Sequence, residues 1–320
     1  MAKKRTTTRT RKKKRNAKAT TPFFRTVKQL LIGAILFFVS IILILFLLDY
    51  LQIVSGEKKR PVKEKRSVPE IDLPTSEQPS GSSQTTTFHL PANAEIPKLR
   101  SKRKEQVIQH EGFTVSYNSD YRIANWVAYE LTEKEAKSKE VERTNKFIPD
   151  PLVKGATATN EDYVRSGYDK GYLAPAGDMK WSAKAMRESF YFSNICPQAP
   201  GLNRGIWKTL EDQARLWAIH NNAVFIVTGP VIEENLEKLG KNKVGIPNTF
   251  YKVICTVVDD KPTGVGFLFE NREYKKTSLK SMAIPIDSVE KVTGIDFFYS
   301  FPEEWQKEME SKVEWKYWSF

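Results

Sequence analysis

The feature that most constrains this chain is an uncharged run of 19 residues, from Leu30 to Leu48. Only Gly33 and Ser40 within it are not strongly apolar. As a helix the run would extend about 29 Å at about 1.5 Å per residue, close to the hydrocarbon thickness of a bilayer. A buried core helix of this length would normally show a polar stripe, and a cleaved signal peptide usually has a shorter apolar core. The run therefore predicts one transmembrane helix, residues 30–48, with the lipid bilayer as its partner.

Basic residues are concentrated around this run. Residues 1–66 hold 18 of the 51 Lys and Arg residues and 3 of the 38 Asp and Glu residues, which leaves 33 basic and 35 acidic residues in the rest. The overall charge of +13 is therefore poor evidence that the folded part binds nucleic acid. Twelve of these basic residues precede the run and six follow it, so the positive-inside rule favours a cytoplasmic N-terminus. We expect a basic cytoplasmic tail, residues 1–29, and a single-pass membrane protein whose C-terminal domain is extracytoplasmic, periplasmic or on the outer face.

The composition changes again after the apolar run. Residues 49–108 are rich in Pro, Ser, Thr, Glu and Lys and show no apolar periodicity, which is typical of a disordered linker. From residue 109 to residue 320 the chain is patterned and rich in aromatic residues, as expected for one folded domain.

Within residues 109–320 the periodicity predicts a mixture of strands and helices. Period-two or continuously apolar runs predict strands at 113–118, 124–130, 224–229, 249–258 and 264–268. Helical spacing predicts helices at 182–189, 206–219, 286–293 and 302–313. Because the two kinds of element do not alternate regularly, the pattern favours an α+β fold over a doubly wound parallel sheet.

Cysteine and histidine offer few catalytic signals. Cys196 and Cys255 are too few for a structural zinc site; two buried free thiols are the favoured interpretation, with a disulfide left open. There is no HExxH and no GxSxG motif. His89 falls in the predicted linker, and His110 and His220 fall at a domain edge and a helix end, where a surface or capping role is the more common one.

The densest polar segment, residues 166–215, carries a recognisable pattern. It contains DKGYLAPA from Asp169, a Trp-Ser pair at Trp181, SNICPQ from Ser193 and LNRGIWKTLE from Leu202. The order and spacing of these pieces resemble the signature of the DNA/RNA non-specific endonucleases, the ββα-metal nucleases similar to endonuclease G. Further pieces typical of the family (WVAYEL, VTGP, FYKV, TGIDFF) extend the resemblance over roughly two hundred residues.

The resemblance implies a fold, a cofactor and a set of site residues. The fold would be a central, mainly antiparallel sheet flanked by helices, with a ββα-metal motif. The cofactor would be one Mg²⁺ ion, or another divalent cation, that is ligated by Asn203 and otherwise mostly by water. DNA and/or RNA backbone would be the partner. The catalytic residues implied are Asp169, Lys170, Tyr172, Asn194, Glu211 and Arg215.

Helical spacing supports part of this assignment independently. Asn203, Trp207, Glu211 and Arg215 are four residues apart, so a continuous helix would present them as one slowly turning row. A metal ligand, a carboxylate that holds water and a guanidinium near the phosphate would then face one groove. The alternative from spacing alone is a helix cap at Asn203 and a solvated ion pair between Glu211 and Arg215.

Two positions depart from the family pattern. Lys170 replaces an arginine, which keeps the charge but loses the bidentate fork. Tyr172 replaces the histidine that acts as general base, and a phenol of pKa about 10 would be ionised in only about one molecule in a thousand at pH 7. The sequence thus leaves three interpretations open. The chain is a membrane-anchored, Mg²⁺-dependent endonuclease; a catalytically impaired nuclease-fold protein that binds nucleic acid or a partner; or a structural envelope protein.

Overall fold

The computed structural model describes residues 91–320. The predicted basic tail, the predicted transmembrane helix and most of the predicted linker lie outside the described residues. Within residues 91–320 no helix combines the length and the apolar character that crossing a membrane requires.

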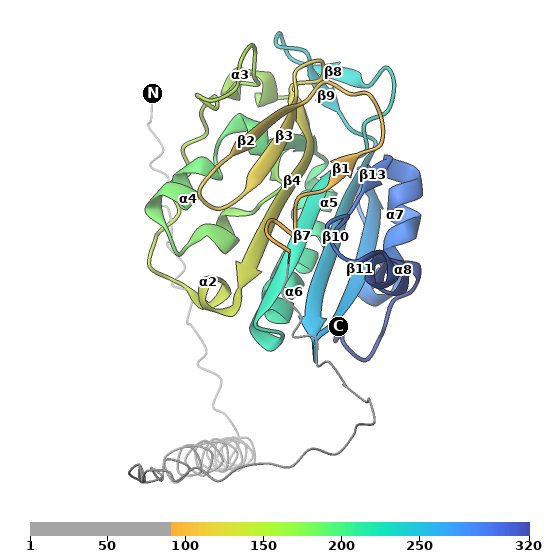
Figure 1. Ribbon diagram of the computed structural model, residues 1–320. Coiled ribbons are helices and arrows are strands. Elements are labelled where there is room, and N and C mark those ends of the chain that lie inside the picture. The colour runs from red at the N-terminus through yellow and green to blue at the C-terminus, as the bar shows by residue number, and fades with distance from the viewer. Residues whose placement is uncertain (1–90) are drawn as a thin grey trace, which may run out of the picture. The chain divides into compact units, whose positions relative to one another are not determined.

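A seven-stranded antiparallel sheet forms the centre of the domain (Figure 1). Its strand order is β12-β11-β10-β7-β4-β3-β2. The strands are β2 (Gln106–Gln109), β3 (Thr114–Asn118), β4 (Ile123–Thr132), β7 (Ala223–Pro230), β10 (Thr249–Val258), β11 (Lys261–Glu270) and β12 (Ala283–Ile284). This sheet and the helices around it confirm the predicted mixed fold with a central antiparallel sheet.

Three two-stranded pairs and seven helices complete the domain. The pairs are β1 (Lys98–Leu99) with β13 (Ile295–Asp296), β5 (Asp169–Tyr172) with β6 (Ile195–Gln198), and β8 (Glu237–Leu239) with β9 (Val244–Ile246). The helices are α2 (Glu133–Lys137), α3 (Asn160–Tyr163), α4 (Ala183–Glu188), α5 (Pro200–Asn203), α6 (Ile206–His220), α7 (Ile286–Thr293) and α8 (Glu303–Ser311). Three short 3₁₀ turns lie at Ala176–Met179, Phe192–Asn194 and Leu279–Met282.

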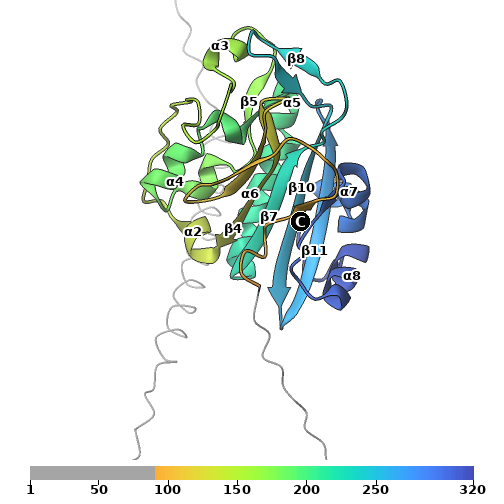
Figure 2. The ribbon, with the colours of Figure 1, turned by 45° about the horizontal axis from the view of Figure 1, so that its top comes forward.

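The central strands of the sheet are buried on both faces, and alternate residues of these strands enter different cores. In β4, Val127 and Tyr129 pack into the core beneath α6, whereas Trp126 and Ala128 pack into the core that α7 and α8 cover. Figure 2 shows α6 on one side of the sheet and the α7–α8 pair on the other. The apolar stripe predicted for α6 is confirmed, because its members, Ile206 to Trp217 at intervals of three to four residues, are all buried.

Residues 91–108 contradict part of the predicted linker. β1 pairs with β13, β2 pairs with β3, and Ala94 is buried in the core under α7 and α8. Asn125 also donates a hydrogen bond to the carbonyl of Lys104. The folded domain therefore begins well before residue 109, because its first short strands are completed by partners that lie later in the sequence.

Both cysteines are buried and free, as favoured from the sequence. Burial raises the pKa of both thiols above the ordinary value, so each remains a neutral thiol at neutral pH.

Candidate active site

The segment DKGY forms β5, which pairs antiparallel with β6 from Asp169 opposite Gln198 to Tyr172 opposite Ile195. Alternation along the strand places Lys170 and Tyr172 on one face and Asp169 and Gly171 on the other. A Cβ added at Gly171 would lie 2.2 Å from Oε1 of the buried Gln198, so a side chain does not fit there. Glycine at this position allows the two strands to pair closely.

Asn194 fixes the chain that follows Tyr172. It is buried, its Nδ2 donates hydrogen bonds to the carbonyls of Ala174 (2.8 Å) and Ser189 (2.9 Å), and its Oδ1 accepts one from the Ala174 amide (2.9 Å). The side chain is thus occupied on both ends by backbone groups. Asn194 therefore stabilises the backbone next to β5 and does not contact a substrate.

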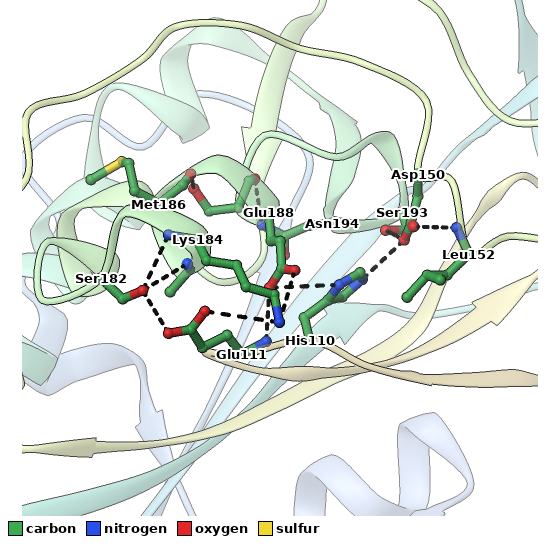
Figure 3. Close-up of polar contacts among 12 residues, drawn as sticks. His110, Glu111, Asp150, Leu152, Ser182, Lys184, Met186, Glu188, Ser193 and Asn194 are labelled. Atoms are coloured by element: carbon green, nitrogen blue, oxygen red, sulfur yellow. Dashed lines mark hydrogen bonds and ion pairs between the residues drawn. The ribbon is translucent and has the colours of Figure 1, made fainter.

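A buried polar network lies beside Asn194 (Figure 3). Asp150 accepts a hydrogen bond of 2.6 Å from Ser193 and lies 3.0 Å from Nε2 of His110, while Glu188 lies 3.9 Å from Nδ1 of the same ring. The expectation that His110 is a surface or capping residue is wrong, since its side chain is fully buried. Because it cannot reach solvent or substrate, it cannot replace the missing catalytic histidine; His220, in contrast, is exposed at the end of α6.

Asn203 and Asp169 form the centre of the candidate metal site. Nδ2 of Asn203 donates a 3.0 Å hydrogen bond to Oδ2 of Asp169, and Arg204 binds both oxygens of the same carboxylate at 2.7 and 2.6 Å. These contacts, that from Arg204 first, hold the pKa of Asp169 below its usual range. Since the amide nitrogen is committed to the carboxylate, the opposite end of the carboxamide, Oδ1, is the end turned away from Asp169 and is left to bind a cation.

The helix after Asn203 is interrupted, in contrast to the continuous helix considered from the spacing. Asn203 ends α5, and α6 begins at Ile206 after Gly205, whose φ of −101° and ψ of −120° are not helical. A Cβ at Gly205 would lie 2.4 Å from the carbonyl oxygen of Gly201, so the break needs glycine. Trp207, at the start of α6, donates a 3.3 Å hydrogen bond from Nε1 to the carbonyl of Tyr172 and so joins α6 to β5.

Tyr172 ends β5 in an aromatic and cationic environment. Nη2 of Arg143 donates a 3.0 Å hydrogen bond to its hydroxyl, and the ring packs against Phe147 and Phe190 with centroid distances of 5.6 and 5.5 Å. Burial raises the pKa of Tyr172 to about 12, against the opposing effect of Arg143. The phenol is therefore neutral at pH 7, where it accepts the hydrogen bond from Arg143.

Lys170 lies on the same side of β5 as Tyr172. Its ammonium group donates a 2.7 Å hydrogen bond to Asn160 and lies 4.4 Å from the centroid of the Phe147 ring. Partial burial lowers its pKa. Lys170 and Arg143 thus place two positive charges around the phenol, an arrangement that attracts a phosphate group.

Glu211 belongs to a second charged group, which consists of Glu211 and Arg215 of α6, Asp178 of the 3₁₀ turn Ala176–Met179 and Lys252 of β10. Arg215 donates a 2.6 Å hydrogen bond to the buried Asp178, pairs with Asp212 and is therefore held by two carboxylates. Lys252 from β10 is buried 4.8 Å from the centroid of the Trp207 ring, and its burial lowers its pKa despite the nearby Glu211. Burial raises the pKa of Glu211, with Asp178 adding to the effect and Lys252 opposing it, so its carboxyl group exchanges a proton far more readily near neutral pH than an ordinary glutamate.

The donor set suits a hard divalent cation. Asn203 offers one carboxamide oxygen, and Asp169 orients the amide; both cysteines are buried, so the available protein ligand is a hard oxygen. Mg²⁺ prefers such a site, because it binds few protein oxygens and retains several water ligands.

The sequence interpretation missed three residues of this site. Arg143 contacts a side chain 29 positions later in the chain, and Asp178 and Lys252 meet Arg215 and Glu211 only through the tertiary fold. No short-range spacing indicates such contacts. The sequence around Arg143 is charged and lies between two patterned segments, but it does not indicate which residue Arg143 contacts.

The fold and this site define an α+β protein whose antiparallel sheet supports a strand–helix unit bearing Asp169 and Asn203. The sequence profile of the DNA/RNA non-specific endonuclease family matches residues 90–304. The chain belongs to this family.

Named relatives agree with that assignment. The chain is 33% identical over 199 residues to the mitochondrial nuclease EXOG of Danio rerio, covering 58% of each protein, and 31% identical over 222 residues to mitochondrial endonuclease G of Homo sapiens, covering 63% of this chain and 73% of the relative. It is 34% identical over 206 residues to nuclease C1 of Cunninghamella echinulata var. echinulata, covering 60% and 82%. The match thus spans less than two thirds of the length of EXOG and more than two thirds of the lengths of endonuclease G and nuclease C1.

A solved structure shares the fold. The crystal structure of an EndoG/EndoGI complex superposes with a TM-score of 0.59 at 31% identity, covering 63% of this chain and 89% of that chain.

Proposed function

We propose that this chain is a metal-dependent endonuclease that hydrolyses phosphodiester bonds of DNA and/or RNA without sequence specificity. The observation that carries the proposal is the Asp169–Asn203 hydrogen bond, which presents a carboxamide oxygen next to the strand that ends in Tyr172. Membership of the nuclease family and relatives named as nucleases support it.

The metal, which we propose to be Mg²⁺, would supply electrostatic stabilisation of the phosphate and of the leaving oxygen. Asn203 would hold it through the carboxamide oxygen, and Asp169 orients the carboxamide through its hydrogen bond with Nδ2. Arg143 and Lys170 bind the non-bridging phosphate oxygens through charge-assisted hydrogen bonds. These positive groups also favour approach of a polyanionic backbone to a domain that is otherwise close to neutral.

In this proposal Tyr172 and Glu211 together replace the missing histidine: one orients the water or the phosphate, and the other accepts the proton. The neutral phenol orients the attacking water or a phosphate oxygen by hydrogen bonding, and its own proton stays on the hydroxyl. Glu211, whose raised pKa makes it the more suitable proton acceptor, receives the proton of the water at its carboxylate. Trp207 holds the carbonyl of Tyr172, and Asn194 holds the backbone of Ala174 just after it.

A second candidate function rests on a specific observation, the raised pKa of Tyr172. A phenol that is not ionised provides no strong base, so the site would bind nucleic acid and cut it slowly. The chain would then act as a nucleic-acid-binding or partner-binding module with the nuclease fold.

A nicking assay separates these candidates. Full-length protein, purified in detergent, is incubated with supercoiled plasmid or with RNA in Mg²⁺ or in EDTA, beside Asn203→Ala. The full chain is needed, since a fragment that began at Gly112 would lack β2. Mg²⁺-dependent cutting that disappears in Asn203→Ala supports the nuclease. Binding without cutting by the wild type, together with cutting by Tyr172→His, supports the module.

We also propose that residues 30–48 anchor the chain in a membrane, with the N-terminus in the cytoplasm. The uncharged apolar run and the excess of basic residues before it support this topology. Protease added to spheroplasts, in which any periplasm is open and the cytoplasmic membrane is intact, should remove the C-terminal domain and leave the N-terminal tail protected. Full protection of both ends would contradict the proposal.

A further inference from the structure

A cluster of carboxylates lies on the opposite side of the sheet from Asn203. Asp287 and Glu290 belong to α7, Glu310 belongs to α8, and both helices pack on the core that lines that face. Each of the three offers a carboxylate oxygen, and these oxygens all lie within 4.8 Å of one another. The proposed catalysis makes no use of this cluster.

The cluster has more negative than positive charge. Asp296 lies beside it, and Arg100 binds Glu290 at 2.9 Å and Asp296 at 3.0 Å. Among residues 91–320, these four carboxylates make two ion pairs, and both are with Arg100. Four carboxylates thus share one guanidinium, and like charges this close repel one another strongly in a partly buried setting.

Glu310 provides a separate indication of a ligand. Its residue is only 6% exposed, and its Oε1 is buried and has no hydrogen-bond partner. By contrast, the oxygens of the neighbouring Glu290 accept hydrogen bonds from the Phe297 amide (2.8 Å) and from Arg100. A buried carboxylate oxygen without a partner is costly, which favours a group that the protein chain does not itself supply.

We infer that Asp287, Glu290 and Glu310 bind a divalent cation, Ca²⁺ in preference to Mg²⁺, at a site that is separate from the active site. Ca²⁺ binds carboxylate oxygens at about 2.4 Å, so its ligands can lie up to about 4.8 Å apart, and three oxygens that all lie within 4.8 Å of one another can share one ion. Mg²⁺ requires shorter distances and retains most of its water. The half-buried Asp287 gives the ion a route from solvent.

Such an ion would join α7 to α8. Helix α7 packs through Ile286 and Val289, and α8 through Met309, onto the same core of the sheet. Because one bound ion would contact carboxylates of both helices, it would stabilise the C-terminal part of the domain in the folded state only. Without an ion, the alternative for Glu310 is to take up a proton.

The test uses full-length protein carrying Asn203→Ala, which removes the proposed active-site ligand. Ca²⁺ is titrated against it by calorimetry and by thermal denaturation. We expect about one ion per chain and a rise in Tm of several degrees. In the double variant with Glu310→Gln, the affinity should fall at least tenfold and the rise in Tm should disappear. Glu308→Gln, an exposed glutamate of the same helix, is the matched control and should leave both unchanged.

Three results would overturn the inference. One is the absence of Ca²⁺ binding to the Asn203→Ala protein. Another is equal binding with and without Glu310→Gln. The third is a Glu310→Gln protein that is more stable than its parent while neither responds to Ca²⁺, which would mean that Glu310 carries a proton. If Glu310→Gln does not fold, the half-buried Asp287→Asn replaces it and must show the same loss of affinity.

Discussion

Nη2 of Arg143 lies 3.0 Å from the hydroxyl oxygen of Tyr172, and the guanidinium carbon lies 5.3 Å from the centroid of the same ring. The guanidinium is exposed, and its Nε is held by Asn145 at 2.7 Å. The pair therefore fixes an exposed cation over the residue that occupies the position of the family's general base. A phosphate that reaches Tyr172 meets Arg143 first.

Replacing Arg143 with alanine should lower kcat/KM on plasmid DNA by about 10- to 100-fold. A charge-assisted hydrogen bond contributes roughly 1.5–3 kcal/mol, which corresponds to that range. Arg143→Lys should recover part of the loss, because lysine keeps the charge without the planar fork. Lys146→Ala, in the same exposed stretch, is the control and should have little effect. An unchanged rate in Arg143→Ala would remove Arg143 from the site.

Restoring histidine at position 172 should raise the rate at pH 7 by about tenfold or more, since general-base catalysis contributes on the order of 100- to 10,000-fold. The pH profile should also change. Tyr172 has a pKa raised to about 12, so wild-type kcat/KM should show no step from this residue between pH 6 and 9. In Tyr172→His the active form is the neutral imidazole, so activity should rise with pH through about 6.5.

Tyr172→Phe distinguishes the role of the phenol in the wild type. If the hydroxyl orients water or phosphate, its loss should lower kcat by roughly tenfold without altering the shape of the pH profile. A profile that loses an alkaline limb in this variant would show that the phenolate is the base after all.

Asn203→Ala should abolish most Mg²⁺-dependent activity, with a fall of about 100-fold or more, because the cation loses its protein oxygen. Asp169→Asn should have a smaller effect and chiefly weaken Mg²⁺ affinity, by about 10- to 100-fold, as expected when a group that orients a ligand is lost. The measurement is the Mg²⁺ concentration needed for half-maximal cutting. Equal Mg²⁺ dependence in wild type and Asp169→Asn would mean that Asp169 serves only its ion pair with Arg204.

The sequence predicted long, regular elements well because their own residues determine them. The bounds expected for the strand at 249–258 and for the helix at 286–293 agree with β10 and α7. The run of strand-forming residues in the one and the helical spacing in the other each extend over eight or more residues, so no single residue decides the prediction.

Short elements and long-range contacts could not be predicted in the same way. β5 is stable as a strand through its pairing with β6, more than twenty residues later, and its own composition is not typical of a strand. His110 is buried beside Asp150, which comes from a distant segment and also accepts a hydrogen bond from Ser193. The break before α6 depends on the close approach of Gly205 to the Gly201 carbonyl, which spacing alone does not reveal.

The contact of Gly171 with Gln198 predicts a stability effect that is separable from catalysis. Gly171→Ala places a Cβ against the side chain of Gln198, which is fully buried. The variant should therefore be less stable by about 1–3 kcal/mol, measured by denaturant unfolding. Gln198→Ala in the same chain removes the clashing atoms and should recover part of the loss, giving a coupling energy of at least about 0.5 kcal/mol in a double-mutant cycle. Purely additive losses would mean that the β5–β6 pair tolerates a side chain at Gly171 by another adjustment. In that case the close pairing of β5 and β6 would not explain why the segment DKGY has a glycine.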